Sequence, residues 1–260
     1  MAKHLIIPDV QTKPGVPNNH LSWAGHYIAD KKPDVIVCIG DFADMPSLSS
    51  YDKGKKSFEG RRYTEDIKAA DEAMNLLLEP IRLEMLRVND PKKKRAKWNP
   101  RLVLTLGNHE DRINRAINDD PKLEGLISVK DLPYKDWEVI PYLDTVTIDG
   151  IVYSHYFTSG VMGRPVSSAR ALVTKKHCSC VMGHVQRKEV DIQYTATGKR
   201  ITGIFAGCYY QHDEDYLTPQ GNAAAWHGLW MLHQVNDGEF DEMPVSLQYL
   251  QERYNVKYSA

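Results

Sequence analysis

Five polar residues follow short apolar runs, and their types suit metal chemistry. They are two aspartates, one asparagine and two histidines: Asp9, Asp41, Asn108, His155 and His184. Carboxylate, amide and imidazole groups form a mixed oxygen and nitrogen set that suits Mn²⁺, Fe, Zn²⁺ or Mg²⁺, and no cysteine is among them. A glycine directly precedes three of the five, as expected where the backbone must turn sharply to aim a side chain. We therefore predict a divalent-metal site.

The apolar runs before these residues are typical of buried strands. They span Leu5–Pro8, Asp34–Ile39, Arg101–Leu106, Ile151–Ser154 and Cys178–Met182. Continuous apolar runs of this length indicate strands that are covered on both faces. In α/β sheets, ligands bind beyond the carboxyl ends of the strands. Residues that are far apart in the sequence are thus predicted to converge.

The remaining pattern predicts a single domain over residues 1–260. Helical spacing covers His20–Asp30, Thr64–Val88 (with Thr64 as N-cap and a kink at Pro80), Glu110–Asn118, Pro121–Ile127 and Ser167–Lys176. Further strands are predicted over Glu138–Ile140, Thr145–Ile148, Lys188–Thr195, Lys199–Phe205, Gly228–Val235 and after Glu239. Strand–helix alternation early in the chain and hairpins late in it favour two stacked sheets in an α/β sandwich. Residues 45–100 are predicted to form a helical and loop insertion that rims the cleft.

Composition and charge exclude several classes of protein. The 260 residues carry 33 Lys and Arg against 34 Asp and Glu, a formal net charge of −1. This balance excludes a globally basic nucleic-acid coat and an acidic disordered tail. No stretch approaches the roughly 20 apolar residues that a membrane span needs. The four cysteines form no CxxC pair, which indicates free thiols in a reducing compartment. We expect a cytoplasmic protein without membrane contact.

Five sequence blocks, in order, resemble those of the calcineurin-like metallophosphoesterases. The blocks are Asp9-Val10-Gln11, Gly40-Asp41-Phe42-Ala43-Asp44, Gly107-Asn108-His109-Glu110, Ser154-His155 and Gly183-His184-Val185-Gln186. The family pattern is D-x-H, GD-x-x-D, GNH-D/E, a lone His and GH-x-H. The resemblance implies a four-layer α/β/β/α sandwich with two stacked mixed sheets.

The resemblance also implies roles for individual residues. Asp41 would bridge two divalent ions, with Mn²⁺ expected first and Mg²⁺, Fe, Zn²⁺ or Ni²⁺ as alternatives. One ion would be held by Asn108, His155 and His184, and the other by Asp9. His109 would stand beside the reacting phosphate, oriented by Asp44. A metal-activated hydroxide would then hydrolyse a phosphate mono- or diester.

Two departures from the family pattern fall on the same ion. Gln11 and Gln186 stand where the family has histidine, and both belong to the ion held by Asp9. A glutamine amide oxygen is a weaker ligand than imidazole. The sequence therefore predicts one tight and one weaker, exchangeable metal site. The alternative is that the glutamines do not bind metal and the protein holds a single ion.

The substrate is predicted from the residues around these blocks. Met45-Pro46 follows Asp44, whereas the phosphoprotein phosphatase branch has Arg-Gly there. Three residues are candidate substrate contacts: Tyr51, in a Ser-, Tyr- and Lys-rich segment after the second block, and Arg112 and Arg115, which follow the third block. We expect a nucleotide or nucleic-acid phosphoester. A broad phosphomonoesterase, including a protein phosphatase, and a catalytically weak phosphate- or nucleic-acid-binding protein are alternatives.

Several other features are assigned structural roles. The basic run 92–97 is interpreted as a solvated loop rather than a nucleic-acid patch, and Cys178 and Cys180 as buried thiols. His212 and His227 are expected at the surface or in packing, with lining of the cleft as the alternative. We predict core positions for Trp226, Trp230 and Tyr249. The third block and the Ser/Tyr/Lys segment resemble metallophosphoesterases of bacteriophages and mobile elements, which would place the protein in a host cytoplasm.

Overall fold

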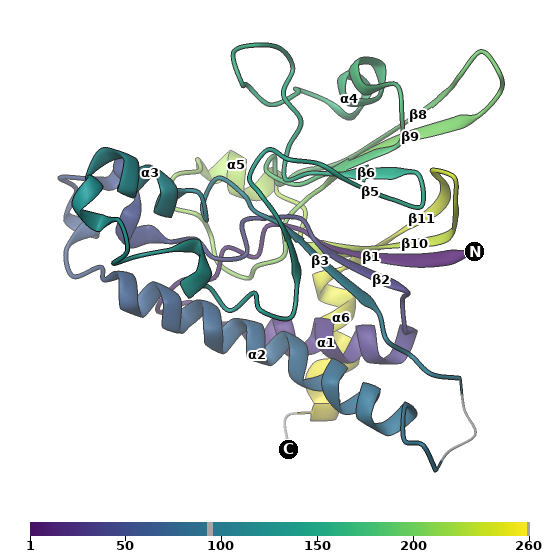
Figure 1. The fold of residues 1–260 in the computed structure, drawn as a ribbon, viewed down its shortest axis with the longest axis horizontal. Helices are drawn as coiled ribbons and strands as arrows, with labels where there is room; N and C mark the ends of the chain where they lie inside the picture. The colour runs from purple at the N-terminus through teal and green to yellow at the C-terminus, as the bar shows by residue number, and fades with distance from the viewer. Residues whose placement is uncertain (93–95, 259–260) are drawn as a thin grey trace.

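The chain folds around two mixed β-sheets, shown in Figure 1. The computed structural model describes residues 1–92 and 96–258. The first sheet has the strand order β11-β10-β1-β2-β3-β4. Its strands are β1 (Ala2–Ile7), β2 (Val35–Cys38), β3 (Arg101–Thr105), β4 (Glu138–Ile140), β10 (Gly228–Asn236) and β11 (Glu239–Ser246). The predicted strands of this sheet are confirmed, and their ends differ by one residue at most except at β1, which begins three residues before the predicted Leu5.

The second sheet has the order β5-β6-β7-β9-β8. Its strands are β5 (Val146–Ile148), β6 (Ile151–Tyr153), β7 (Cys180–Met182), β8 (Lys188–Tyr194) and β9 (Arg200–Ala206). The β5–β6 and β8–β9 pairs are antiparallel hairpins, while β6, β7 and β9 run parallel. Asp149 and Gly150 form the first hairpin turn, as the sequence predicts.

The parallel strands bring the polar blocks to one edge of the fold. Ile7 at the end of β1 lies opposite Cys38 of β2, and Cys38 lies opposite Leu104 of β3. The last residues of these three strands are therefore level, and each polar block leaves the sheet at the same edge. The ends of β6 and β7 contribute the remaining two blocks from the second sheet.

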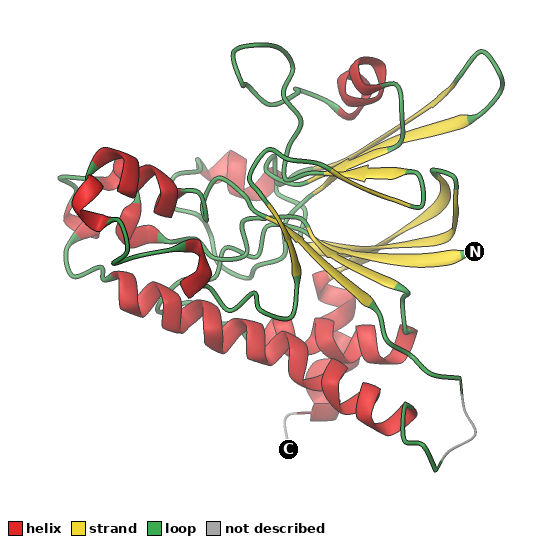
Figure 2. Ribbon diagram, in the orientation of Figure 1, coloured by secondary structure: helices red, strands yellow, loops and turns green. Residues whose placement is uncertain are grey.

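Helices cover the outer face of each sheet, as Figures 1 and 2 show. Below the first sheet lie α1 (Asn19–Lys31), α2 (Tyr63–Val88) and α6 (Leu247–Tyr258), and above the second sheet lies α4 (Ala169–Lys176). The shorter α3 (Arg112–Asp119) and α5 (Pro219–Ala224) lie beyond the strand ends. Three apolar clusters separate the layers. The cluster between the sheets includes Val37, Tyr153, Val181 and Trp230.

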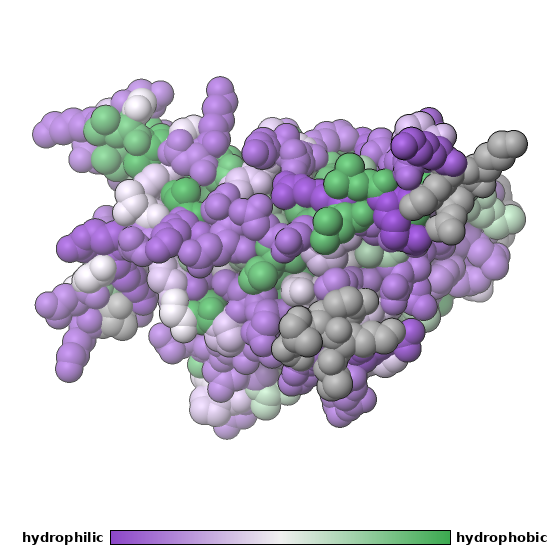
Figure 3. All heavy atoms as spheres, turned by 90° about the horizontal axis from the view of Figure 1, so that it is seen from below, coloured by the Kyte–Doolittle hydropathy of each residue, from purple (hydrophilic) through white to green (hydrophobic). Residues whose placement is uncertain are grey.

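The outer surface of the lower helical layer is mostly hydrophilic (Figure 3). On α2, Leu83 and Leu86 are exposed among polar neighbours. Within the described parts of the chain, none of the helices combines the length and the apolar character needed to cross a bilayer. Residues 93–95 of the basic run 92–97 lie outside the described residues.

Four local predictions were wrong. Thr64 is not an N-cap, because α2 begins one residue earlier, at Tyr63. The helix predicted over 121–127 is a 3₁₀ turn that covers Pro121–Leu123 alone. At its start, the Asp120 side chain accepts a hydrogen bond from the backbone N–H of Lys122. Tyr249 is 43% exposed rather than buried. Cys178 precedes β7 and is only partly buried, with its Sγ 3.5 Å from that of buried Cys180. Pro80 lies inside α2, and the kink predicted there stays a prediction.

Candidate metal centre and catalytic site

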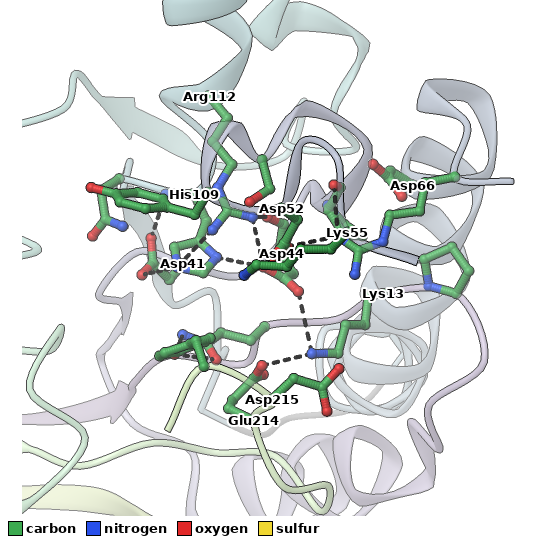
Figure 4. A pocket seen from close by; sticks show the side chains of 18 of the residues that line it. Lys13, Asp41, Asp44, Asp52, Lys55, Asp66, His109, Arg112, Glu214 and Asp215 are labelled. Atoms are coloured by element: carbon green, nitrogen blue, oxygen red, sulfur yellow. Dashed lines mark hydrogen bonds and ion pairs between the residues drawn. The ribbon is translucent and has the colours of Figure 1, made fainter. Parts of the chain in front are cut away.

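The strand ends border an open cavity of about 1340 Å³. Side chains from the first, second, third and fifth sequence blocks line it, and Figure 4 shows several of them facing one another. Residues 46–66, which include three 3₁₀ turns and the start of α2, form one rim. The opposite rim is the segment 214–217. The rest of α2 runs away from the cavity beneath the first sheet.

Three residues from both sheets form a compact group of metal donors. Ligand atoms of Asp41, His155 and His184 all lie within 4.8 Å of one another. Asn108 joins them: its Oδ1 is 3.0 Å from His155 Nε2 and 2.8 Å from His184 Nδ1. Burial, the largest effect, and the nearby charge of His155 lower the pKa of His184 to about 4, so its imidazole is neutral and able to bind metal. The predicted ligands of the tight site are thus brought together.

The hydrogen bonds of His155 show that this group fits a cation. His155 Nδ1 lies 2.9 Å from the carbonyl oxygen of Ile39, which only accepts, so Nδ1 carries a proton. In the neutral ring, Nε2 then presents a lone pair to Asp41 Oδ2 at 3.3 Å and to Asn108 Oδ1. Burial opposes charging of this ring, but the Asp41 carboxylate outweighs it and raises the pKa of His155 to about 9. At neutral pH a proton on Nε2 supplies the positive charge between these oxygens, and a divalent ion could take its place.

Asp9 supplies a buried carboxylate on the adjoining side. Its Oδ1 accepts a hydrogen bond from the backbone N–H of His184 at 3.0 Å, whereas its buried Oδ2 has no hydrogen-bond partner. Burial is the main reason that the pKa of Asp9 is raised to about 7. A buried carboxylate oxygen without a partner is costly unless an ion completes it. This atom therefore also fits a metal ligand.

The glycines before the site residues are needed mainly for space. A Cβ on Gly107 would lie 2.0 Å from Asp41 Oδ1, and a Cβ on Gly183 would lie 2.3 Å from Asp9 Oδ1. Both glycines have ordinary negative-φ or extended backbones, so the sequence-based explanation from a sharp turn holds only for Gly40, whose φ is +89°. Each carboxylate occupies the volume that a side chain would fill.

Left-handed backbone is concentrated at the site. Non-glycine residues with positive φ include Gln11 (48°), Asp41 (50°), Met45 (51°), His184 (66°) and Gln186 (62°). Such conformations cost on the order of 1 kcal/mol or more each and are typical of functional sites. The surrounding hydrogen bonds maintain them: the backbone N–H of Gln11 donates to the Asp41 carbonyl at 2.8 Å.

His109 is held at the cavity wall by Asp44. His109 Nδ1 is 2.6 Å from Asp44 Oδ1, and Nε2 lies 3.7 Å from Asp41 Oδ2. Burial disfavours the charged imidazolium, but the charge of Asp41 and the hydrogen bond to Asp44 raise the pKa of His109. Although burial alone would raise the pKa of Asp44, His109, Lys13 and Arg112 together lower it. The predicted pair of His109 and its orienting carboxylate is present.

Glu110 has a role that the sequence did not indicate. Its fully buried carboxylate accepts backbone N–H bonds from Asp41, Phe42, Ala43 and Gly107 at 2.7–3.0 Å, and a hydroxyl bond from Tyr134 at 2.9 Å. Burial raises the pKa of Glu110, and these donors oppose that effect. Glu110 thereby fixes the loop after β2 against the loop after β3. Its position inside a recognised block was the available signal.

Gln11 and Gln186 lie at the cavity, but their amides are engaged elsewhere. Both Nε2 groups donate to the hydroxyl of Tyr216, at 3.1 Å from Gln11 and 2.6 Å from Gln186. The Oε1 of Gln186 accepts a hydrogen bond from the buried Tyr210 hydroxyl at 3.1 Å. Tyr216 was not among the predicted site residues, and its polar surroundings in the sequence give no signal of this contact.

The predicted substrate contacts are placed differently from one another. Tyr51 lines the cavity and is 81% exposed. Arg112 also lines it and donates to the carbonyl of Asp44 at 2.6 Å. Arg115 is not among the lining residues; its guanidinium donates to the main-chain carbonyl of Asn108 from outside.

A buried ion-pair network on the opposite rim was missed. Lys13 Nζ lies 2.7 Å from Glu214 Oε2 and 3.3 Å from Asp44 Oδ2 (Figure 4). His212 contacts the other oxygen of Glu214 at 2.7 Å, and neither it nor His227 lines the cavity. Both rings pack against Tyr210, in agreement with the packing role expected for them. Lys13 lies in a Pro/Gly/Asn-rich loop, where a sequence gives no hint of such a contact.

No protein-family model matches the chain, and no curated protein matches it significantly.

Proposed function

We propose that this chain is a metal-dependent phosphoesterase with a metallophosphoesterase-type α/β/β/α fold. The observation that carries the proposal is the buried group of metal donors around Asp41, in which His155 Nε2 lies 3.3 Å from the Asp41 carboxylate and 3.0 Å from the Asn108 amide oxygen. The adjacent pair of His109 and Asp44 supports a catalytic role, because binding alone does not need a buried histidine held by a carboxylate.

Each residue at the site has a distinct task in this proposal. Asp41, Asn108, His155 and His184 would hold a divalent ion, for which Mn²⁺ suits the oxygen and nitrogen donors. When bound, the ion would activate water and neutralise charge on the phosphoryl oxygens. His109 carries a proton at Nε2 and delivers it to the leaving oxygen.

Asp44 and Arg112 prepare His109 for this step. Asp44 accepts a hydrogen bond from Nδ1–H and fixes the ring so that Nε2 faces the cavity. Arg112 donates to Asp44 at 3.0 Å and holds that carboxylate ionised. A positioned general acid of this kind contributes about 10²- to 10⁴-fold to a rate.

The charges around the cavity favour a compact phosphoester over a long polyanion. The lining contains five lysine and arginine residues against eight aspartate and glutamate residues. Lys13, Lys55, Arg61 and Arg112 are each paired with a carboxylate. A nucleic-acid backbone needs cations that are free to replace its counterions. We therefore propose a nucleotide or another small phosphate ester as substrate.

The test is turnover by metal-depleted protein to which single divalent ions are returned. We expect Mn²⁺ to restore hydrolysis of p-nitrophenyl phosphate or its bis ester, with the ratio of the two rates giving the mono- or diesterase preference. Asn108→Ala should abolish this activity, and Asn114→Ala, on the exposed face of α3, should not. Equal turnover in the two variants, or none with any ion, would contradict the proposal.

The preference for a compact substrate is tested by salt. If the substrate contacts mainly the site, KM should change little between low and physiological ionic strength. A steep rise of KM for an oligonucleotide substrate would indicate the polyanion that the cavity charges disfavour.

A further inference from the structure

The glutamine side of the site forms a closed hydrogen-bond network. A phenol hydroxyl has one proton to donate and two lone pairs to accept. The two lone pairs of the Tyr216 hydroxyl accept from Gln11 Nε2 and Gln186 Nε2, and Gln11 Oε1 lies 3.3 Å from the same oxygen. On its other side, Gln186 Oε1 is engaged by Tyr210.

Exchanging the amide oxygen and nitrogen of either glutamine does not free a ligand. With Gln186 reversed, its oxygen accepts from Tyr216 and its nitrogen donates to Tyr210, so both phenols remain bonded to it. With Gln11 reversed, its oxygen takes the position 3.1 Å from the Tyr216 hydroxyl and accepts from it. Each amide oxygen is thus engaged by a phenol and keeps one lone pair, so a cation at the glutamines would have to share these oxygens with hydrogen bonds already made.

The segment that carries Tyr216 is anchored to the rest of the site. Glu214, two residues earlier, is buried and bonded to Lys13 and His212. Its backbone N–H donates to Asn222 Oδ1 at 3.0 Å, and its carbonyl accepts from the backbone N–H of Leu217 at 3.1 Å. Although the Tyr216 side chain is 55% exposed, its hydroxyl end is thus held between the glutamines.

Little negative charge is available to hold a second ion on this side of the site. In residues 1–92 and 96–258, the one group of three or more His, Cys, Asp or Glu ligands close enough to share an ion is Asp41, His155 and His184. Asp9 adds a single carboxylate next to the glutamines.

From these contacts we infer that the chain binds one divalent ion, and that the Tyr216 hydroxyl, held by Gln11 and Gln186, occupies the side of the site where the family pattern would place a second. The inference rests on the proposed function. It resolves the alternative that the sequence left open for the two glutamines.

The first test counts ions in the full-length wild-type protein. Metal-depleted chain is titrated with Mn²⁺, and bound Mn²⁺ is measured by elemental analysis and by electron paramagnetic resonance. We expect one ion per chain and the spectrum of isolated Mn²⁺. Two ions with a spin-coupled spectrum would overturn the inference and leave the proposed function intact, whereas no bound ion would overturn both.

The second test rebuilds the missing ligands. Gln11→His and Gln186→His are combined with Tyr216→Phe, which keeps the ring and removes the hydroxyl, and we expect two Mn²⁺ per chain. The matched control is Gln193→His with Tyr194→Phe on β8, away from the cavity, which should stay at one. Circular dichroism confirms that each variant is folded. A folded rebuilt variant that still binds one ion would overturn the role given to Tyr216 and the glutamines.

Discussion

The two sides of the site differ in how their polar atoms are satisfied. Around Asp41, His155 and Asn108, buried oxygen and nitrogen atoms converge on a point that a proton or a divalent ion can occupy. The side-chain amides of Gln11 and Gln186 instead form hydrogen bonds with tyrosine hydroxyls of the protein itself. Both sides lie beyond the carboxyl ends of strands of the same two sheets, so we attribute the difference to residue type.

The difference shows why residue type matters at equivalent places. An imidazole whose Nδ1 donates to a backbone carbonyl has one nitrogen left to bind either a proton or a metal ion, as Nε2 of His155 does. An amide carries its own donor and acceptor and can be satisfied by a neighbouring hydroxyl. A site with imidazole on one side and amide on the other is predicted to be asymmetric in metal affinity.

The largest expected effect comes from changing the charged side of the site. Asp41→Asn keeps the shape and the left-handed backbone, which asparagine tolerates, but removes the central charge. We expect Mn²⁺ affinity to fall by more than about 100-fold, beyond the range for outer-shell changes, with loss of activity. Gln11→Asn is the matched change on the other side, and calorimetric titration should show its Mn²⁺ affinity close to wild type. Similar losses in both variants would remove the asymmetry.

The next effect separates chemistry from metal binding. His109→Asn should lower kcat by about 10²- to 10⁴-fold, the usual contribution of a general acid, while Mn²⁺ content stays at the wild-type value. Asp44→Asn should fall between this variant and wild type, because Arg112 still contacts the Asp44 main chain. Loss of bound Mn²⁺ from His109→Asn would instead make His109 a ligand.

A third prediction concerns the framework on which both sides depend. The Glu110 carboxylate accepts hydrogen bonds from backbone N–H groups at N···O distances of 2.7–3.0 Å. Glu110→Gln places an amide NH₂ group against some of these donors. Loss of charged hydrogen bonds in a buried position should lower the free energy of unfolding by about 2–3 kcal/mol. Urea denaturation with an unchanged m-value is the measurement, and exposed Glu124→Gln is the control. Equal midpoints would show that the loops are held without Glu110.

The smallest expected effect distinguishes two arginines. Arg112→Ala removes a guanidinium that lines the cavity and contacts Asp44, so we expect a loss in kcat/KM of about tenfold or more, comparable to other supporting residues. Arg115→Ala acts from outside the cavity and should change kcat/KM by less than about threefold, since exposed pairs contribute under about 1 kcal/mol. Steady-state kinetics of both variants on one substrate is the measurement. A larger loss of kcat/KM in Arg115→Ala than in Arg112→Ala would place Arg115 at the substrate.

Much of the fold could be predicted because the strands have strong local signals. The β-branched run before Gly40 and the apolar run before Gly107 predict central strands, and the polar residues after them predict the site. Helix boundaries were less predictable: Thr64 has a suitable side chain, but the helix already begins at Tyr63. Over 121–127, turn-forming residues at Pro121 and Gly125 outweigh the helical spacing.

The parts of the site that were not predicted depend on contacts across the fold. Tyr216 is separated from Gln11 by 205 positions, and Lys13 from Glu214 by 201. Neither pair has a sequence pattern, because such contacts are set by how the segment 212–218 returns to the cavity. Glu110 differs, since its block was recognised and only the direction of its side chain was unknown.

The left-handed backbone at the site has a consequence for laboratory evolution. Glycine at Asp41, Met45 or His184 would relieve conformational energy on the order of 1 kcal/mol per position. A selection for heat resistance alone would therefore enrich such replacements and erode two of the proposed ligands. Selection for turnover would retain them and accept a lower melting temperature. Sequencing the survivors of both selections would show which residues are retained for activity rather than for thermal stability.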